Sequence, residues 1–108
     1  MMNETLRQKQ SRFVWMVADL IAHVKSLGYE LTFGDAFRDD RCPYGQRLSL
    51  HKKRLAVDFN LFVAGEYITS SDHPAYRQIG EYWESIGGAW GGRFNDSNHF
   101  SLEHDGKK

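Results

Sequence analysis

His51, Asp58 and His99 are the residues of this sequence whose types and spacing could bind a metal ion. His51 precedes Asp58 by seven residues in "SLHKKRLAVD" (49–58), and His99 lies in "DSNHF" (96–100). Two imidazole nitrogens and one carboxylate oxygen, with a fourth position open for water, are typical of catalytic zinc sites. A water bound there can reach a pKa of about 7. Asp96, close in sequence to His99, could then act as the general base.

Spacing alone leaves an alternative open. The sequence has five histidines and many acids, so numerous triplets are possible, and the helical H-E-x-x-H zinc motif is absent. His51 and His99 could instead be ordinary surface or hydrogen-bonded histidines. Asp58 bears on this choice because it lies in the middle of the hydrophobic run "LAVDFNLFV" (55–63). A buried charge needs a partner or a metal.

Hydrophobic periodicity predicts two helices that could support these residues. From Glu4 to about Leu27, apolar residues recur at a spacing of three or four, which indicates an amphipathic helix. Its predicted buried stripe comprises Phe13, Val14, Val17, Leu20, Ile21, Val24 and Leu27. A second helix is predicted over 74–86, with Pro74 in its first turn and a buried side made of Ile79, Tyr82, Trp83 and Ile86.

Alternating segments predict the strands. Residues 29–38 place Leu31, Phe33 and Phe37 on one side, as a half-buried strand would. Residues 54–68 predict a strand, a turn at "AGE" and a returning strand. In this hairpin Asp58 shares one face with Ala56 and Asn60, and the opposite face carries Leu55, Val57, Phe59, Leu61 and Val63. A last strand at 99–103 points His99, Ser101 and Glu103 away from Phe100 and Leu102.

The order of these elements predicts one α+β domain over residues 1–108, with helices packed on one face of a small, mainly antiparallel sheet. Fourteen basic residues balance fourteen acidic ones, which argues against a nucleic-acid partner. Cys42 is the only cysteine, so no intrachain disulfide is expected. We expect a monomer. We also expect no stable membrane insertion, because no apolar run reaches roughly 18 residues. We also expect synthesis in the cytoplasm without a signal peptide.

Two motifs resemble the signatures of a known family. "SLHKKRLAVD" is similar to the S-x-H-x-x-G-x-A-x-D signature of the zinc D-alanyl-D-alanine carboxypeptidase family, which also contains phage L-alanyl-D-glutamate endopeptidases. "WGGRFNDSNHF" (90–100) resembles the second signature, W-G-G followed by Asp or Glu, two residues and His-Phe. "FGDAFRD" (33–39) lies where that family has a strand ending in a substrate-contacting Arg. The resemblance extends from the N-terminal helix to about Leu102.

The resemblance implies roles for individual residues. His51, Asp58 and His99 would bind Zn²⁺, and Asp96 would be the general base that deprotonates the attacking water and later protonates the leaving amine. Arg38 would polarise the scissile carbonyl and stabilise its oxyanion.

Arg38 and Ser49 could also have purely structural roles. Arg38 could simply form a salt bridge with Asp35, Asp39 or Asp40. Ser49 would support the ligand loop or touch substrate, but its hydroxyl could equally cap a turn. Glu103 and His104 lie outside the motif, and we expect them to face solvent. Arg54 departs from the family pattern, because it stands where the first signature has Gly, which often marks a backbone geometry that Arg accepts poorly.

From the resemblance we expect a zinc peptidase that cuts a peptide bond of the peptidoglycan stem, similar to phage endolysins, acting on the cell wall after release. The second motif favours an L-Ala-D-Glu endopeptidase over a D-Ala-D-Ala carboxypeptidase. The alternative from another class is a non-catalytic zinc-binding module, as in the fold-related Hedgehog signalling domain. A purely structural site would need neither Asp96 nor Arg38, which disfavours this alternative.

Overall fold

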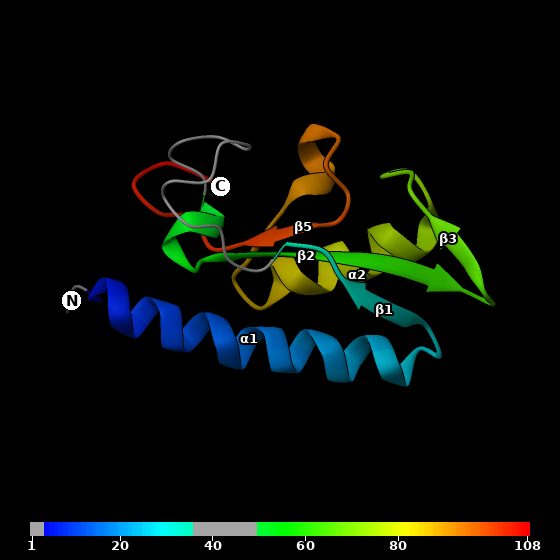
Figure 1. Ribbon diagram of the computed structural model, residues 1–108, viewed down its shortest axis with the longest axis horizontal. Helices are drawn as coiled ribbons and strands as arrows, with labels where there is room; N and C mark the ends of the chain where they lie inside the picture. The colour runs from blue at the N-terminus through cyan, green and yellow to red at the C-terminus, as the bar shows by residue number, and fades with distance from the viewer. Residues whose placement is uncertain (1–3, 36–49) are drawn as a thin grey trace.

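The computed structural model describes residues 4–35 and 50–108, which form two helices and an open sheet (Figure 1). The helices are α1 (Leu6–Ser26) and α2 (Pro74–Ser85). The strands are β1 (Glu30–Phe33), β2 (Ala56–Val63), β3 (Glu66–Ile68), β4 (Ala89–Trp90) and β5 (His99–Ser101). Two short 3₁₀ helices, η1 (Leu50–Lys53) and η2 (Gly91–Phe94), complete the described elements. The α+β class predicted from the sequence is confirmed.

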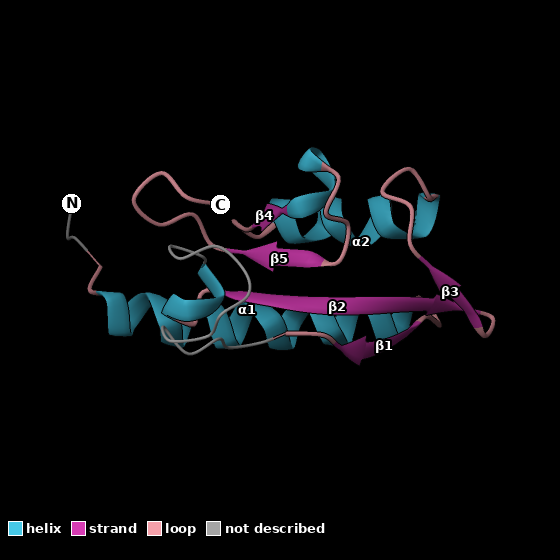
Figure 2. Cartoon of the chain, turned by 45° about the horizontal axis from the view of Figure 1, so that its top comes forward, coloured by secondary structure: helices cyan, strands magenta, loops and turns pink. Residues whose placement is uncertain are grey.

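All the described strand pairs are antiparallel. The order across the sheet is β1-β2-β5-β4, and β3 pairs with the end of β2 through a tight hairpin turn. The long strand β2 therefore contacts three other strands, and Figure 2 shows it crossing the middle of the molecule. Ala64 and Gly65 form the hairpin turn, with φ angles of 51° and 82°. Two successive positive φ angles are typical of the type I′ turn that joins two antiparallel strands.

Figure 1 shows α1 running below β2 and α2 behind it, and in Figure 2 both helices lie behind the strands. The Trp83 ring on α2 packs edge-on against Phe13 of α1 and against Phe100 of β5. The Trp83 indole also donates a 3.0 Å hydrogen bond to the carbonyl of Ser101, and the Tyr76 hydroxyl donates one of 2.7 Å to the carbonyl of Phe59. One sheet face, which carries Phe59 and Phe100, is thus buried under the helices. Side-chain alternation leaves Asp58 and His99 on the other face.

The helix ends agree with the local sequence. Thr5 caps α1 in a reciprocal capping box with Gln8, and Pro74 occupies the first turn of α2. The predicted stripe of α1 is wrong at two positions, because Val14 is 61% exposed and Ile21 is 39% exposed. The buried residues of α1 are instead Phe13, Met16, Leu20 and Val24. The buried stripe of α1 is therefore narrower than its hydrophobic residues suggested.

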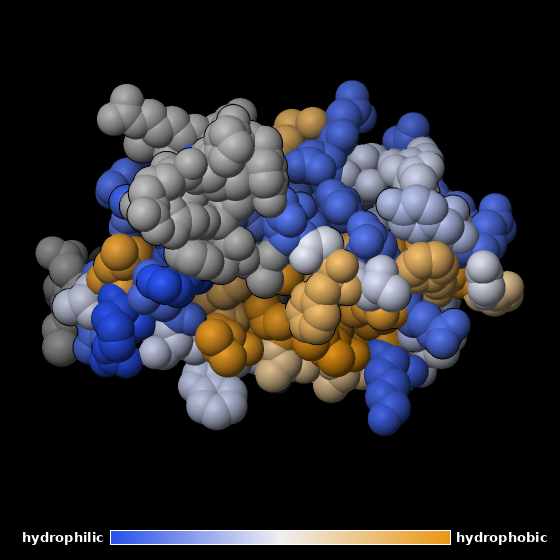
Figure 3. Space-filling model, viewed as in Figure 1, coloured by the Kyte–Doolittle hydropathy of each residue, from blue (hydrophilic) through white to orange (hydrophobic). Residues whose placement is uncertain are grey.

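Strand β1 is shorter and more exposed than predicted. It ends at Phe33, whose side chain is 68% exposed, although one side of its ring contacts Phe59 at 5.2 Å between centroids. The physical reason is its position, because β1 is an edge strand paired only with β2. Figure 3 shows apolar side chains gathered over α1 and β1 on this side of the molecule. Phe37 lies outside the described residues.

Candidate metal centre

Strand pairing places Asp58 directly opposite His99. Asp58 pairs with His99 in the register of β2 and β5. The backbone of Asp58 bonds on its other side, since its N–H donates to the carbonyl of Asp35 at 2.7 Å and its carbonyl accepts from the N–H of Gly34 at 2.8 Å. Asp58 and His99 therefore form a non-hydrogen-bonded antiparallel pair, the kind in which opposing side chains come closest.

The 3₁₀ helix η1 delivers His51 to the same face. Leu50 and His51 are both buried, and the carbonyl of Leu50 accepts a hydrogen bond from the N–H of Leu55 at 2.9 Å, which closes the turn just before β2. Arg54 ends this turn with a φ of 58°. A positive φ is the conformation that glycine adopts at least cost, which explains why the resembling signature has Gly at this position. With Arg54 in this conformation, Nε2 of His51 lies 3.1 Å from Oδ1 of Asp58.

A tight loop after β4 holds His99. The N–H of Asp96 donates to the carbonyl of Gly91 at 2.8 Å, and the N–H of His99 donates to the carbonyl of Asp96 at 3.0 Å. A Cβ atom at Gly91 would lie 2.3 Å from the carbonyl oxygen of Asp96 and 2.6 Å from Cβ of His99. Trp90 anchors the far side of the loop through a 2.8 Å hydrogen bond from its indole to the carbonyl of Ser97. Gly91 and Trp90 of the "WGG" motif thus shape the turn that orients the His99 side chain.

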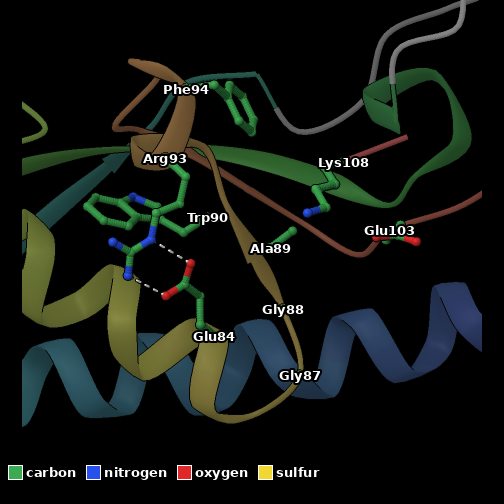
Figure 4. A pocket seen from close by; sticks show the side chains of 9 residues that line it. All are labelled: Glu84, Gly87, Gly88, Ala89, Trp90, Arg93, Phe94, Glu103 and Lys108. Carbon is green, nitrogen blue, oxygen red and sulfur yellow. Dashed lines mark hydrogen bonds and ion pairs between the residues drawn. The ribbon is translucent and has the colours of Figure 1, made fainter. Parts of the chain in front are cut away.

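A pocket of about 460 Å³ lies on the outer side of this loop (Figure 4). In it the Arg93 guanidinium donates two hydrogen bonds to the Glu84 carboxylate, at 2.7 and 2.9 Å, and lies 5.4 Å from the centre of the Trp90 ring. These contacts join η2 to α2. The pair is surface-exposed, so its contribution to stability is small, but it ties the loop that precedes His99 to α2.

The three candidate ligands converge. Nε2 of His51 lies 3.1 Å from Oδ1 of Asp58, and Nδ1 of His99 lies 3.6 Å from the same oxygen. All three ligand atoms lie within 4.8 Å of one another. Ligand atoms about 2.1 Å from a tetrahedral ion lie about 3.4 Å apart, so this spacing suits zinc. His51 and His99 are 2% and 7% exposed, which would hold both rings rigidly.

The chemistry of these atoms fits a cation. Oδ1 of Asp58 is buried, and no hydrogen bond of good geometry satisfies it in the described part of the chain, although Nε2 of His51 is so near. Buried oxygens in this condition are rare in proteins. Burial alone would raise the pKa of Asp58, but contacts with His51 and His99 outweigh it and lower the pKa to about 2. Asp58 is therefore a carboxylate at neutral pH, as a metal ligand must be.

Asp96 lies at the mouth of the candidate centre. Its Oδ2 atom is 3.9 Å from Nδ1 of His99, and its side chain is 53% exposed. It stands beside the ligand atoms but remains open to solvent and substrate, as a general base requires.

Arg38 and Ser49 lie outside the described residues, so their roles stay predictions. His104 lies outside the candidate centre: its backbone pairs with Lys107, and Nε2 of its ring lies 3.5 Å from Oδ2 of Asp105. Glu103 is exposed.

Sequence reasoning missed residues that shape the centre without carrying reactive groups. A Cβ atom at Gly34 would lie 2.9 Å from Cβ of Asp58, so only glycine lets β1 approach the candidate ligand this closely. A row of amides also flanks Asp58. Asn98 donates to Asn60 at 3.2 Å, and Asn60 donates to Thr32 at 3.3 Å. In the sequence, Gly34 in "FGD" and Asn98 next to His99 were the only signals that could have indicated these supporting residues.

Comparison with known families supports the geometry. Residues 44–102 match the model of the D-alanyl-D-alanine carboxypeptidase family, and this stretch is more than half of the 108-residue chain. The match contains His51, Asp58, Asp96 and His99, whereas Arg38 precedes it. A search among curated proteins found no match. No helix in the described residues is both long and apolar enough to cross a membrane. The chain belongs to the D-alanyl-D-alanine carboxypeptidase family of zinc peptidases.

Proposed function

We propose that this protein is a zinc-dependent peptidase that hydrolyses the L-Ala–D-Glu bond of the peptidoglycan stem peptide. The observation that carries the proposal is the convergence of His51, Asp58 and His99, with Asp96 only 3.9 Å from Nδ1 of His99, in a member of this peptidase family. As in phage endolysins, the protein would act on the cell wall after release from the cytoplasm.

The side chains divide the chemistry between them. Zinc held by Nε2 of His51, Oδ1 of Asp58 and Nδ1 of His99 would supply a Lewis acid that makes water reactive at neutral pH. Asp96 would take the proton from the attacking water and deliver it to the leaving amine, a role typically worth about 10²–10⁴ in rate. Arg38, by analogy with the family signature, would stabilise the developing oxyanion. Burial of both histidines would keep the reacting geometry fixed.

Two features favour catalysis over a purely structural zinc site. Closed structural sites use four protein ligands, whereas the described residues bring three together. Asp96 is also half-exposed beside them rather than buried among them. The second candidate function is D-Ala-D-Ala carboxypeptidase activity, which is the description of the matching family. The second sequence motif favours the endopeptidase.

Mass spectrometry of peptidoglycan digests tests the proposal. Zinc-loaded protein is incubated with sacculi from Gram-negative and Gram-positive bacteria, and the fragments are identified. An endopeptidase generates new amino termini on D-Glu, whereas a carboxypeptidase releases free D-Ala. The Asp96→Ala variant serves as the blank. Zinc-loaded wild-type protein that releases no more than this blank from either kind of sacculus would refute the peptidase function.

A further inference from the structure

A small hollow of about 220 Å³ reaches Asp96, which lies 3.9 Å from Nδ1 of His99. It lies between β3 and the loop that precedes His99, and its lining includes Tyr67, Thr69, Asn95, Asp96 and Asn98. Asp96 belongs both to this lining and to the surroundings of His99. A group placed in the hollow would therefore be close to the bond that the proposed enzyme cuts.

Tyr67, which lines the hollow, connects it to the polar face of β2. Side chains of alternate residues point to the same side of a strand, so Asp58, Asn60 and Phe62 follow one another on this face. Tyr67 pairs directly with Phe62 across the hairpin, and the two rings stack with their centroids 5.2 Å apart. Tyr67 nevertheless remains 54% exposed. A row of side chains thus runs from the metal ligand through an amide to an exposed aromatic ring.

The walls of the hollow are held in place. The hydroxyl of Ser97 donates to the carbonyl of Thr69 at 2.9 Å, which ties the loop to the end of β3. Asn98 is fixed by its 3.2 Å hydrogen bond to Asn60. Asn95 has a φ of 62°, so its backbone conformation suits Asn or Gly. In ligand sites, a few polar groups held in place in this way fix the orientation of the ligand.

We propose that this hollow is a subsite for the sugar to which the stem peptide is attached, an inference that rests on the proposed function. A pyranose ring presents apolar C–H groups on its faces and hydroxyl or amide groups at its edges. An exposed tyrosine ring suits such a face, and the side chains of asparagine offer both donors and acceptors to the edges. The subsite would make the enzyme recognise stem peptides that are still joined to the glycan strand.

The spacing suits cleavage next to the sugar. In the stem, one L-alanine and a lactyl group separate the sugar from the L-Ala–D-Glu bond, which is about 7 Å of extended chain. Phe62, beside Tyr67, lies four residues from Asp58 along β2, or roughly 13 Å. The sugar ring would thus fall between Asp96 and Tyr67. The D-Ala–D-Ala bond lies at least five such units from the sugar, roughly 17 Å, which would carry the ring past Tyr67.

Two matched substrates test the sugar subsite. One is an N-acetylmuramyl stem peptide, and the other is the same peptide with an acetyl group in place of the muramyl group, so that neither has a free amino terminus. For zinc-loaded wild-type protein we expect kcat/KM to be about tenfold higher for the muramyl substrate, mainly through KM. Tyr67→Ala should abolish this ratio, and Asn95→Gly, which keeps the backbone conformation, should reduce it. Tyr67→Phe should retain it.

Trp15→Ala is the matched control, because Trp15 is also an exposed aromatic residue, at 73%, but lies on α1. It should leave the ratio at the wild-type value. Equal kcat/KM values for the two substrates would refute the sugar subsite but not the peptidase function. A loss in Tyr67→Ala that is equal for both substrates would show that the hollow holds peptide instead. If wild-type protein cuts neither substrate, the proposed function fails and the subsite falls with it.

Discussion

Oδ1 of Asp58 lies 3.6 Å from Nδ1 of His99 because the two residues face each other directly across the antiparallel pair of β2 and β5. A shift of this register by one residue would turn one of the two side chains to the opposite face of the sheet. The packing of Val57, Phe59 and Phe100 beneath the helices fixes the register. The candidate metal centre thus depends on the hydrophobic core of the protein.

Asp58 and Asp96 should have separable roles. Asp58→Ala should abolish zinc binding, because it removes one of three ligands. Asp96→Ala should retain about one zinc per chain and lose about 10²–10⁴ in kcat, because a general base is not needed to hold the metal. Metal analysis and peptidoglycan hydrolysis measured on the same samples check this. A folded Asp96→Ala protein without zinc would mean that Asp96 is a ligand.

Removal of zinc should lower the melting temperature. A ligand that binds only the folded state stabilises that state, by about 2.7 kcal/mol at a free concentration 100 times its dissociation constant. We expect a chelator to lower the melting temperature of wild-type protein, and added zinc to restore it. Asp58→Ala serves as the control, because its melting temperature should not respond to either addition. An unchanged melting curve in wild-type protein shown to be metal-free would contradict a zinc site.

Gly34→Ala should weaken zinc binding without removing any ligand. The new methyl carbon would lie 2.9 Å from Cβ of Asp58, so β1 or the carboxylate must move. We expect the zinc affinity to fall about tenfold or more, as for other changes that displace a ligand indirectly. Competition with a coloured chelator measures this affinity. Glu30→Ala, on β1, which ends one residue before Gly34, is the control. Wild-type affinity in Gly34→Ala would show that the chain adapts at no cost.

Arg54→Gly should stabilise the protein. Arg54 has a φ of 58°, which costs a residue with a side chain about 1 kcal/mol relative to glycine. We expect the free energy of unfolding to rise by about this amount, less whatever the side-chain contacts of Arg54 contribute. Arg54→Ala separates the two effects, since it keeps the strained conformation and loses the contacts. Denaturant unfolding should rank Arg54→Gly above Arg54→Ala, and the reverse order would contradict the interpretation.

The zinc-free protein should lose stability in acid partly through Asp58. The pKa of Asp58 is about 2 in the folded chain, below its ordinary value of 3.8, so the unfolded chain binds more protons between these values. The contribution of Asp58 is therefore complete above about pH 4 and declines as the pH falls towards about 2. Unfolding curves of zinc-free Asp58→Asn should depend less on pH in this range than those of zinc-free wild-type protein. Equal pH dependence would contradict a depressed pKa.

The fold could be predicted well where the hydrophobic pattern extended over many residues. The hairpin of β2 and β3 and the helix α2 lie where alternation and helical spacing placed them. The prediction was wrong where burial depends on neighbours in space. Val14 and Ile21 are apolar like Leu20, but the rest of the fold buries Leu20 completely and leaves these two exposed. The short elements η1, η2 and β4 were missed, because two to four residues are too few to show a period.

The candidate site was predicted from residue chemistry together with the resemblance of two motifs to a known family, and the structure shows what arranges it. Histidine and aspartate stand out in a sequence because few side chains bind metals. Gly34 and Gly91 are equally important for the geometry, but their role depends on the closeness of Asp58, Asp96 and His99 across the fold. Tyr67 could not have been linked to the site, because its place depends on the register of the β2–β3 hairpin.

The candidate ligands come from distant parts of the chain. His51 and His99 are separated by 48 positions (99 − 51 = 48), and β2, β3, α2 and β4 lie between them. An ion bound to both would act as a removable cross-link around this loop, in a sequence whose single cysteine allows no internal disulfide. Because the site exists only when the folded chain has closed this loop, the ion stabilises the folded state relative to the unfolded ensemble. Zinc supply would therefore govern how long the chain survives proteases as well as how fast it works.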